Sequence, residues 1–397
     1  MIIGPAFRQI EKRVKRRVCG QPHYFRAGSH LGFEGALAAE LNRLGFTGTT
    51  QVPSGIAFEA KFADAWKVCA FSRTARKLEM ELAHFHAENF GKLEKELEKI
   101  PWELYLPPNS EPKVTAKCKK SRLYHSDAVA ERLEPILKER LSQSGEVPGA
   151  LEAGQAGAEP QRVSIELAND ACTVFLDLSG EPLYKRGHNR FVEEAPLQET
   201  MAASILLTAG LASAPQLLDP MCGSGTFSLE AAAIANGHHP GLSRHFAFEA
   251  DPAFGREAYS YLLSHAPAPD VLQDFAIYTA DISPKAVQTT EHNAACSGEA
   301  DLVKPVLADF FKQKIPHKPG SLLVLNPPYG LRIKADTTRL YKEIGKKIKL
   351  DYRSCKIALL CPDRKCFAAF NPGMASVVRT NHGGLDIFAI FGEAHRL

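Results

Sequence analysis

The pattern of hydrophobic and polar positions changes near residue 195 of this chain. From Ala195 onward, short apolar runs alternate with segments whose apolar residues recur at helical spacing. This alternation is typical of a parallel α/β sheet covered by helices. The expected strands are 216–218, 276–279, 303–307, 322–325 and 356–360. Two later runs, 376–379 and 387–391, are expected to complete the sheet as an antiparallel hairpin across Gly383 and Gly384.

The front of the chain has the pattern of a mixed α+β region. A first small unit is expected from strands 24–27 and 55–60 and helices 35–44 and 63–71. A second unit is expected from helices 88–100 and 127–141 and strands 114–118, 163–167 and 173–178. Within this second unit, between helix 127–141 and strand 163–167, residues 142–159 consist mainly of Gly, Ala, Ser, Glu and Pro, which predicts a flexible loop.

A length of 397 residues with 45% hydrophobic content suits two or three domains with real cores. We divide the chain into a basic extension (1–20), an α+β part (21–72), a second α+β domain (73–182) and an α/β domain (183–397). The 48 basic and 45 acidic residues nearly balance, so total charge says little about partners. Two basic clusters, 8–17 and 113–122, are of the kind that solvated faces carry and phosphate backbones attract.

The nine cysteines form no C-x-x-C pair, which favours reduced thiols in a cytoplasmic protein over a zinc site or disulfides. No run approaches eighteen consecutive apolar residues, so no membrane span is expected. The start of the chain lacks an apolar signal-peptide core, and Glu11 argues against an Arg-rich transit peptide.

A glycine-containing loop, DPMCGSGTF at 219–227, follows the first strand of the α/β region and opens a helix. Gly223 and Gly225 allow a tight turn and close backbone approach to a ligand at the helix N-terminus. A dinucleotide fingerprint would need a third glycine where Ser228 stands, and a phosphate loop would need Gly-Lys-Ser/Thr. The loop therefore suits a carboxylate and a ribose, with Asp219 behind it.

Two more acids follow the next two expected strands. Asp281 can take both hydroxyls of a ribose at its strand end, and Asp309 can accept from an adenine amino group with Phe310 along the ring. Either acid alone is better explained as a helix cap or a surface charge. At successive strand ends, the three acids outline an adenosine-shaped ligand.

Asn326-Pro327-Pro328-Tyr329 follows the apolar run 321–325. The prolines force the backbone to leave the strand as a rigid, extended turn. This turn offers an amide oxygen, a backbone carbonyl and an aromatic face, which are what a planar amine substrate needs. The four residues alone fit a proline turn with Tyr329 packed in the core somewhat better, and the motifs upstream reverse that preference.

In this order, the motifs resemble those of the THUMP-domain class I RNA methyltransferases, in particular the guanine-N2 branch that acts on bacterial 23S rRNA. The resemblance runs from about Tyr24 to the end of the chain. It is carried by the segments KKSRLYHS (119–126), LYKRG (183–187), APLQET (195–200), DPMCGSGT (219–226), FEADPAF (248–254), ADIS (280–283) and LNPPYG (325–330). The chain departs from the family at loop 142–159, which is longer, and at His188-Asn189, which interrupts a stretch usually written R-G-Y-R.

The resemblance implies a Rossmann-like methyltransferase domain with a mostly parallel seven-stranded sheet, preceded by a ferredoxin-like and THUMP region. It implies transfer of a methyl group from S-adenosylmethionine to the N2 amine of a guanine in 23S rRNA, without a metal. The catalytic residues would be Asn326, Pro327 and Tyr329. The cofactor would be bound by Asp219, Pro220, Cys222, Gly223, Ser224, Gly225, Thr226, Asp281, Ile282, Asp309, Phe310 and Asn326. RNA would be bound by Lys117, Lys119, Lys120, Arg122, Tyr124 and Arg186.

The motifs leave three alternatives open. A tRNA guanine-N2-methyltransferase combines the same two modules. An N6-adenine or N4-cytosine methyltransferase uses the same Asn-Pro-Pro-Tyr chemistry, since the motif does not distinguish one amine from another. A ribosome-assembly factor that binds RNA without catalysis is a third, although the cofactor loop is intact.

Overall fold

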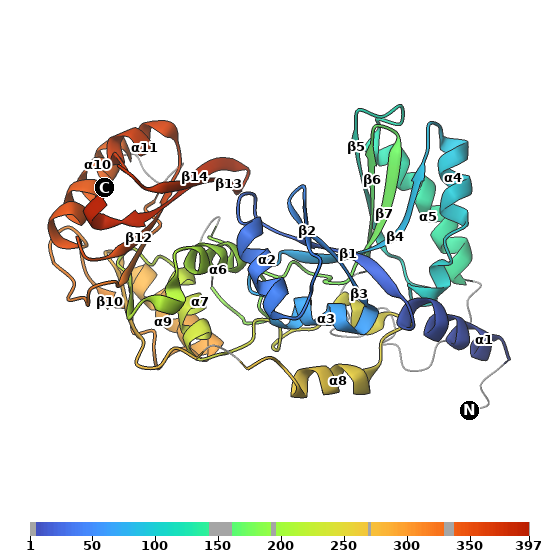
Figure 1. The fold of residues 1–397 in the computed structure, drawn as a ribbon, viewed down its shortest axis with the longest axis horizontal. Helices are drawn as coiled ribbons and strands as arrows, with labels where there is room; N and C mark the ends of the chain where they lie inside the picture. Colours follow the sequence, from blue (N-terminus) through green and yellow to red (C-terminus); the bar gives the residue numbers. More distant parts are fainter. Residues whose placement is uncertain (1–4, 143–160, 192–195, 269–270, 329–336, 397) are drawn as a thin grey trace. The chain divides into compact units, whose positions relative to one another are not determined.

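The computed structural model of the chain describes residues 5–142, 161–191, 196–268, 271–328 and 337–396, with the side chains described from residue 8 onward. Of the expected flexible loop at 142–159, all but Ser142 lies outside the described residues. The chain forms two compact units (Figure 1). The first comprises Met1–Gly28, Glu40–Lys185 and Gly241–Pro267, and the second comprises Ser29–Ala39, Arg186–Pro240 and Ala268–Leu397.

The first unit contains a seven-stranded sheet in the order β2-β3-β1-β4-β7-β6-β5. All neighbouring strands run antiparallel except β5 and β6, which are parallel. The strands are β1 (Pro22–Gly28), β2 (Thr50–Val52), β3 (Gly55–Lys61), β4 (Lys77–His86), β5 (Lys113–Lys119), β6 (Arg162–Ala168) and β7 (Ala171–Asp177). Strand β5 therefore forms one edge of the sheet, and its alternate residues are exposed.

The helices associated with this unit match the expected ones, with additions. They are α1 (Pro5–Val14), a π-helical turn η1 (Lys15–Cys19), α2 (Glu34–Arg43), α3 (Phe62–Phe71), α4 (Phe90–Glu98), the 3₁₀ turn η2 (Trp102–Leu104), α5 (Ser126–Ser142), the 3₁₀ turn η4 (Ala247–Ala250) and α8 (Arg256–Ser264). Helix α4 begins later than expected because Asn89 caps it, accepting the N–H of Lys92 at 2.9 Å. Helix α2 contributes residues to both units.

Strand β4 is an element that the sequence did not predict. Its buried positions include Glu79, a charged residue that hides the strand's alternation of apolar and polar positions. Glu79 is tolerated there because its carboxylate binds Arg26 at 2.7 Å and also contacts Lys77. Buried charges require such partners. The strand was therefore hidden by an ion pair that forms only in the folded sheet.

The segment Gly241–Pro267 belongs to the first unit, although it lies within 183–397, the range expected to form the second. It is fixed there by aromatic packing. The ring of Phe248 stacks on Trp66 with centroids 5.3 Å apart, and Phe254 and Tyr259 pack against the same indole. Aromatic burial of this kind contributes strongly to stability.

The second unit contains the predicted seven-stranded sheet, in the order β10-β9-β8-β11-β12-β14-β13. The first five strands in this order are parallel, and β14 pairs antiparallel with both β12 and β13. The hairpin across Gly383 and Gly384 is confirmed. The strands are β8 (Gln216–Asp219), β9 (Ala276–Asp281), β10 (Val306–Leu307), β11 (Leu322–Leu325), β12 (Lys356–Cys361), β13 (Ser376–His382) and β14 (Leu385–Glu393).

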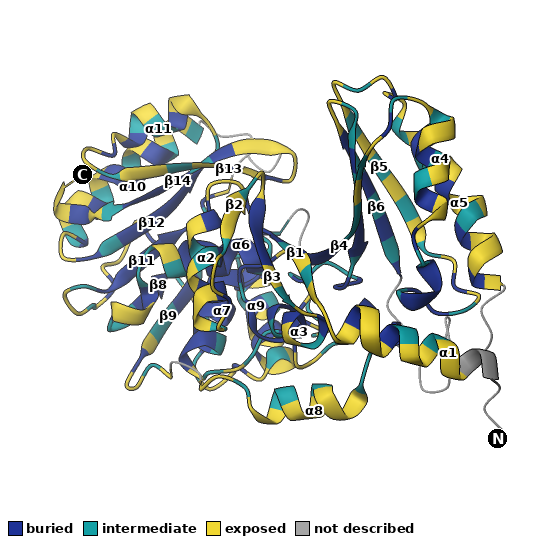
Figure 2. Cartoon of the chain, turned by 45° about the vertical axis from the view of Figure 1, so that its right-hand side comes forward, coloured by how far each residue is buried: buried dark blue, intermediate teal, exposed yellow. Residues whose placement is uncertain are grey.

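Helices connect the parallel strands, as such a sheet requires. They are α6 (Glu199–Thr208), α7 (Thr226–Ala235), α9 (Pro284–Ser297), α10 (Thr337–Asp351) and α11 (Arg364–Phe370), with 3₁₀ turns η3 (Leu211–Ser213) and η6 (Ala394–Arg396). Strand β11 is buried along its whole length, which explains its uninterrupted apolar sequence. Figure 2 shows buried positions concentrated in the sheet, and exposed positions on α10 and α11, whereas α6 and α7 are almost entirely buried.

The expectation of a strand over 303–307 was wrong at its start. Only Val306–Leu307 pairs with β9. Pro305 has no N–H to donate to a ladder, and Val303 instead packs into the core beside α7 and α9, where its N–H binds the carbonyl of Glu299 at 2.9 Å.

Candidate active site

The glycine loop, residues 220–225, links β8 to α7 in a tight turn. The N–H of Gly225 donates to the carbonyl of Cys222 at 2.8 Å, and the N–H of Cys222 donates to the carbonyl of Ala280 on β9 at 3.0 Å. Helix α7 then begins at Thr226. The first N–H groups of a helix have no partner within it, so this end of α7 is suited to a polar or anionic ligand group.

The two glycines of this loop have different roles. Both have positive φ, +55° at Gly223 and +83° at Gly225, which favours glycine. A Cβ on Gly223 would meet no atom within 4 Å, whereas a Cβ on Gly225 would lie 2.6 Å from Cγ2 of Thr290. Gly225 therefore lets α7 and α9 approach each other, while Gly223 faces open space.

Asp281 ends β9 and ties the glycine loop to the start of α9. Its Oδ2 accepts the backbone N–H of Gly223 at 3.0 Å, and its Oδ1 accepts that of Ser283 at 2.9 Å. A carboxylate has about four acceptor sites, so further hydroxyl donors can still bind it. Ser283 caps α9 by accepting the N–H of Ala286 at 3.3 Å, and Pro284 occupies the first turn.

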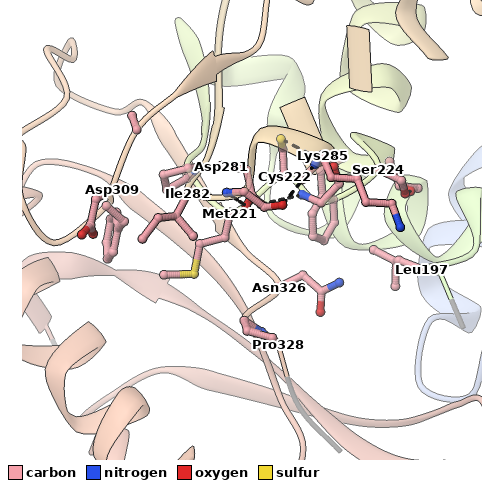
Figure 3. Close-up of a pocket in the computed structure, with 18 of the residues that line it drawn as sticks. Leu197, Met221, Cys222, Ser224, Asp281, Ile282, Lys285, Asp309, Asn326 and Pro328 are labelled. Atoms are coloured by element: carbon pink, nitrogen blue, oxygen red, sulfur yellow. Dashed lines mark hydrogen bonds between the residues drawn. The ribbon is translucent and has the colours of Figure 1, made fainter. Parts of the chain in front are cut away.

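These elements surround a cavity of about 870 Å³ (Figure 3). In the close-up, Asp309 lies at one end and Leu197 at the other, with Asp281 and Asn326 between them. Ten of the predicted cofactor residues line it, namely Pro220, Cys222, Gly223, Ser224, Thr226, Asp281, Ile282, Asp309, Phe310 and Asn326. The predicted residues Asp219, Gly225 and Pro327 are not among the described residues that line it.

The end of the cavity near Asp309 combines an acid with an aromatic ring. Oδ1 of Asp309 accepts the N–H of Phe311 at 2.9 Å, which leaves its other oxygen toward solvent, where Lys312 lies 3.7 Å away. Phe310 lines the cavity but is almost fully buried, and its ring stacks on Tyr352 with centroids 5.7 Å apart. The position of Phe310 is thus fixed by the core rather than by a ligand.

Asn326 stands at the end of β11 and borders the cavity. Its amide Oδ1 is buried and has no hydrogen-bond partner among the described residues. An unsatisfied buried acceptor costs about 1–3 kcal/mol, so a donor that enters the cavity would find a strong site. Pro328 also borders the cavity, Pro327 is buried, and Tyr329 lies outside the described residues.

Asp219 lies behind the loop, almost fully buried. Its Oδ2 accepts the hydroxyl of Ser228 at 2.8 Å, and that hydroxyl accepts the one of Thr279 at 2.9 Å. Its Oδ1 has no partner among the described residues. The pKa of Asp219 is raised to about 7, mainly by burial; the hydrogen bond from Ser228 opposes this shift and the nearby charge of Asp281 adds to it. Asp219 supports the loop from the core.

Arg186 differs from its prediction as an RNA contact. Its side chain is 6% exposed, and Nε and one terminal nitrogen bind the carboxylate of Glu230 at 3.1 and 3.2 Å. A buried guanidinium held by a carboxylate on α7 has no surface with which to bind a phosphate. The sequence could not distinguish a buried arginine paired with a carboxylate from an exposed arginine that binds RNA, because a basic residue near a loop is compatible with either.

The stretch after Arg186 supports the glycine loop from outside. The amide nitrogen of Asn293 on α9 donates to the carbonyls of Ser224 and Phe191, both at 2.9 Å. The guanidinium of Arg190 binds Glu199 at 2.6 Å and reaches the hydroxyl of Thr226 at 3.5 Å. The sequence analysis did not single out Asn293 or Arg190, since neither lies within a motif.

Several cavity residues were also missed, namely Pro196, Leu197, Met221, Phe227, Ser283, Lys285, Ala286, Ala308, Phe311, Pro328 and Leu340. Most are neighbours of predicted residues and could have been found by extending each motif. Lys285 is of most chemical interest, because Figure 3 shows its side chain extending past Ser224 toward the end of the cavity near Leu197. Its position in the first turn of α9, after Pro284, was the available signal.

The remaining predicted RNA residues lie in the first unit. Lys117 and Lys119 are exposed on the edge strand β5, and Lys120 follows it at φ +50°. Tyr124 is 70% exposed. Arg122 is exposed too, but it contacts Glu88 and lies 3.8 Å from Asp170, so its charge is partly compensated.

Within the described part of the chain, no helix is long and apolar enough to cross a membrane, and no group of three or more His, Cys, Asp or Glu side chains is arranged to hold a metal ion. All nine cysteines are free.

Comparison with solved structures identifies the class of this fold. Among solved structures, SMU.472 complexed with S-adenosylhomocysteine superposes with a TM-score of 0.80 at 26% identity, covering 95% of this chain and 99% of that one. The strand order and the glycine loop at the end of β8 define a class I methyltransferase fold.

The model of the family described as RMKL-like, methyltransferase domain, matches residues 186–384, half of the chain, and the chain belongs to this family. Residues 25–78 match the model of the RlmL ferredoxin-like domain.

Two curated relatives extend the similarity. The ribosomal RNA large subunit methyltransferase K/L of Syntrophotalea carbinolica is 31% identical over 353 residues, which are 85% of this chain and 49% of that protein. The protein of the same name from Shewanella sp. strain ANA-3 is 27% identical over 370 residues, 91% of this chain and 51% of that protein. The chain thus spans about half the length of these relatives.

Proposed function

We propose that this protein is an RNA methyltransferase that transfers a methyl group from S-adenosylmethionine to the exocyclic N2 of a guanine in 23S rRNA. The observation that carries the proposal is the buried amide oxygen of Asn326 at the edge of the cavity, which has no hydrogen-bond partner in the described part of the chain. It is an acceptor held in place before any substrate arrives.

The residues of the cavity fit the cofactor. The open space at Gly223 would admit the amino-acid part against backbone at the N-terminus of α7. Asp281, already oriented by two backbone N–H groups, would accept the ribose hydroxyls. Asp309 and Phe310 would receive the adenine. When bound, the cofactor supplies an electrophilic methyl group on a sulfonium.

The protein's own contribution to the chemistry is to orient a weak nucleophile. The lone pair of an exocyclic amine is delocalised into its base, so the amine must be positioned for attack. Oδ1 of Asn326 and the carbonyl of Pro327 would each accept one N–H, directing the lone pair toward the methyl and stabilising the positive charge that develops. Tyr329 is the expected stacking surface for the extruded base. The proton leaves after transfer, when the amine has become acidic.

The assignment of rRNA as substrate is supported by the names of the relatives and by the ferredoxin-like region that this chain shares with their family. The choice of guanine N2 follows from the motif resemblance. A tRNA guanine or an N6-adenine target uses the same acceptor geometry, so the experiment must distinguish these products.

The test is to incubate the purified protein and labelled cofactor with rRNA and tRNA from cells that lack this protein. The nucleosides of each RNA are then analysed by mass spectrometry. We expect N2-methylguanosine in 23S rRNA, at a nucleotide that is unmethylated in those cells and methylated in wild-type cells. Label in tRNA, label as N6-methyladenosine, or no transfer with intact cofactor binding would each overturn the proposal.

A further inference from the structure

The N-terminal helix carries a row of cations along one side. Arg8, Lys12 and Arg16 are spaced four residues apart across α1 and the start of η1, and all three are exposed. Side chains four residues apart in a helix are neighbours, about 5–6 Å apart at Cβ. Figure 2 shows most of α1 as exposed or intermediate positions.

The other side of this helix is engaged with the rest of the first unit. Val14 and Val18 are buried, and Arg13 binds Glu103 at 2.8 Å. Lys15 is compensated by Glu11 at 2.7 Å on the same helix. The helical segment is therefore attached to the first unit by buried valines and an ion pair. These contacts fix the side of the helix that faces solvent, which is the side that carries the row.

The row itself forms no ion pair among the described residues, although Glu11 interacts with Arg8 at longer range. Within the described residues, Arg8, Lys12 and Arg16 have no acidic side chain within ion-pair distance, unlike Arg13 and Lys15. Like charges four residues apart destabilise a helix by about 0.2–0.5 kcal/mol per pair. The arrangement is unfavourable in the isolated protein and becomes favourable beside a polyanion.

We propose that the row of Arg8, Lys12 and Arg16 is a second RNA-binding surface, separate from β5, that contacts phosphates of the RNA backbone. The inference rests on the proposed function for the identity of the polyanion. An anionic membrane is the other partner that basic helices bind, but binding it requires a free apolar face. The buried valines of this helix are already used inside the protein.

The test compares the full chain with the variant Arg8→Gln/Lys12→Gln/Arg16→Gln, since glutamine removes charge and keeps helix propensity. The matched control, Lys92→Gln/Lys95→Gln/Lys138→Gln, removes three exposed lysines from α4 and α5 of the same unit. The probes are a fluorescein-labelled RNA hairpin titrated at several salt concentrations, and vesicles of phosphatidylglycerol and phosphatidylcholine. Binding of S-adenosylhomocysteine and circular dichroism check that the fold is intact.

We expect the row variant to bind the hairpin about one to two orders of magnitude more weakly at low salt, with a salt slope smaller by about two to three units, and the control to bind like the wild type. Unchanged hairpin binding, an equal loss in the control, or vesicle binding that the variant loses while hairpin binding remains would overturn the inference. The proposed function fails separately, through absence of methyl transfer to 23S rRNA by the wild type.

Discussion

The carboxylate of Asp281 accepts the backbone N–H of Gly223 at 3.0 Å and so joins the end of β9 to the turn of the glycine loop. The same carboxylate accepts the N–H of Ser283 at the start of α9. One side chain thus holds the glycine loop and the start of α9 in place without a ligand. The same two hydrogen bonds fix the orientation of the carboxylate and therefore of its remaining acceptor sites.

Replacing Asp281 with alanine should weaken binding of S-adenosylhomocysteine by about 1–3 kcal/mol, a rise in Kd of roughly fivefold to 150-fold, because hydrogen bonds involving a charged group are lost. Calorimetry measures this directly. Asp281→Asn is the matched control, since its oxygen can still accept one of the two backbone N–H groups, and we expect a smaller loss. Unchanged affinity in the alanine variant would remove Asp281 from the cofactor site.

Gly225→Ala should destabilise the fold by roughly 1–3 kcal/mol, because φ is +83° and the new Cβ would lie 2.6 Å from Cγ2 of Thr290. Thr290→Ser removes that methyl and keeps the hydroxyl that donates to the carbonyl of Gly223 at 2.9 Å. The double variant should therefore recover part of the lost stability, leaving the cost of the positive φ. Urea unfolding of both single variants and the double variant tests this. Additive losses would contradict the close packing of α7 on α9.

Asn326→Ala should reduce methyl transfer by about 10²–10³ under single-turnover conditions and leave cofactor affinity nearly unchanged. The estimate follows from the loss of one preorganised group at the reacting centre, as for an oxyanion donor. The amide oxygen lies buried with no partner among the residues that the structure describes, and we propose that it accepts the substrate amine. A near-normal rate in this variant would exclude the proposed orientation of the nucleophile.

The second unit could be predicted well from the sequence because its central parallel strands, β8, β11 and β12, are buried along nearly their whole length. The run Leu322–Leu325 is apolar at every position, and polar residues follow directly where the strand ends at the cavity. In such a sheet, strand ends and binding residues coincide in the sequence. The strands apart from the start of β10, the hairpin and ten of the twenty-one residues that line the cavity followed from that coincidence.

What the sequence did not predict depends on contacts between distant residues. Strand β4 was hidden because Glu79 is buried by its pairing with Arg26, 53 positions away. Arg186 looked like an RNA contact because its partner, Glu230, lies 44 positions further along the chain. The placement of Phe248 against Trp66 in the first unit likewise has no local signal.

Asp219 should make stability depend on pH in a defined direction. Burial raises its pKa from the ordinary value for an aspartate, about 3.9, to about 7 in the folded protein. The folded state therefore binds an extra proton between about pH 4 and 7, and this stabilising contribution is lost as pH rises through that range, by at most about 1.36 kcal/mol per pH unit. Asp219→Asn keeps the acceptor for Ser228 and removes the titration. Urea unfolding at several pH values should show that the free energy of unfolding falls less steeply with rising pH in this variant than in the wild type. Equal pH dependence in the two proteins would show that Asp219 does not titrate with a raised pKa.

The exposed edge of the first unit should bind RNA through its lysines. Lys117 and Lys119 project from β5 at the sheet edge, and Lys120 follows at once. Lysines on an edge strand also prevent strands of other molecules from pairing with it, so their exposure alone does not show RNA binding. The two roles differ in salt dependence, since phosphate contacts release counterions and edge protection does not.

Replacing Lys117, Lys119 and Lys120 with glutamine should weaken RNA binding and lower the salt slope by up to about three units, because each phosphate contact contributes nearly one unit. The comparison is Arg122→Gln, which should have a smaller effect because Glu88 and Asp170 already compensate that charge. Cofactor affinity should stay at the wild-type value in both variants, since the cavity is formed by the second unit. Fluorescence anisotropy with the labelled hairpin over a range of salt concentrations measures the slope. If the triple variant keeps the wild-type affinity and slope while it gains a tendency to aggregate, the lysines protect the edge and do not bind RNA.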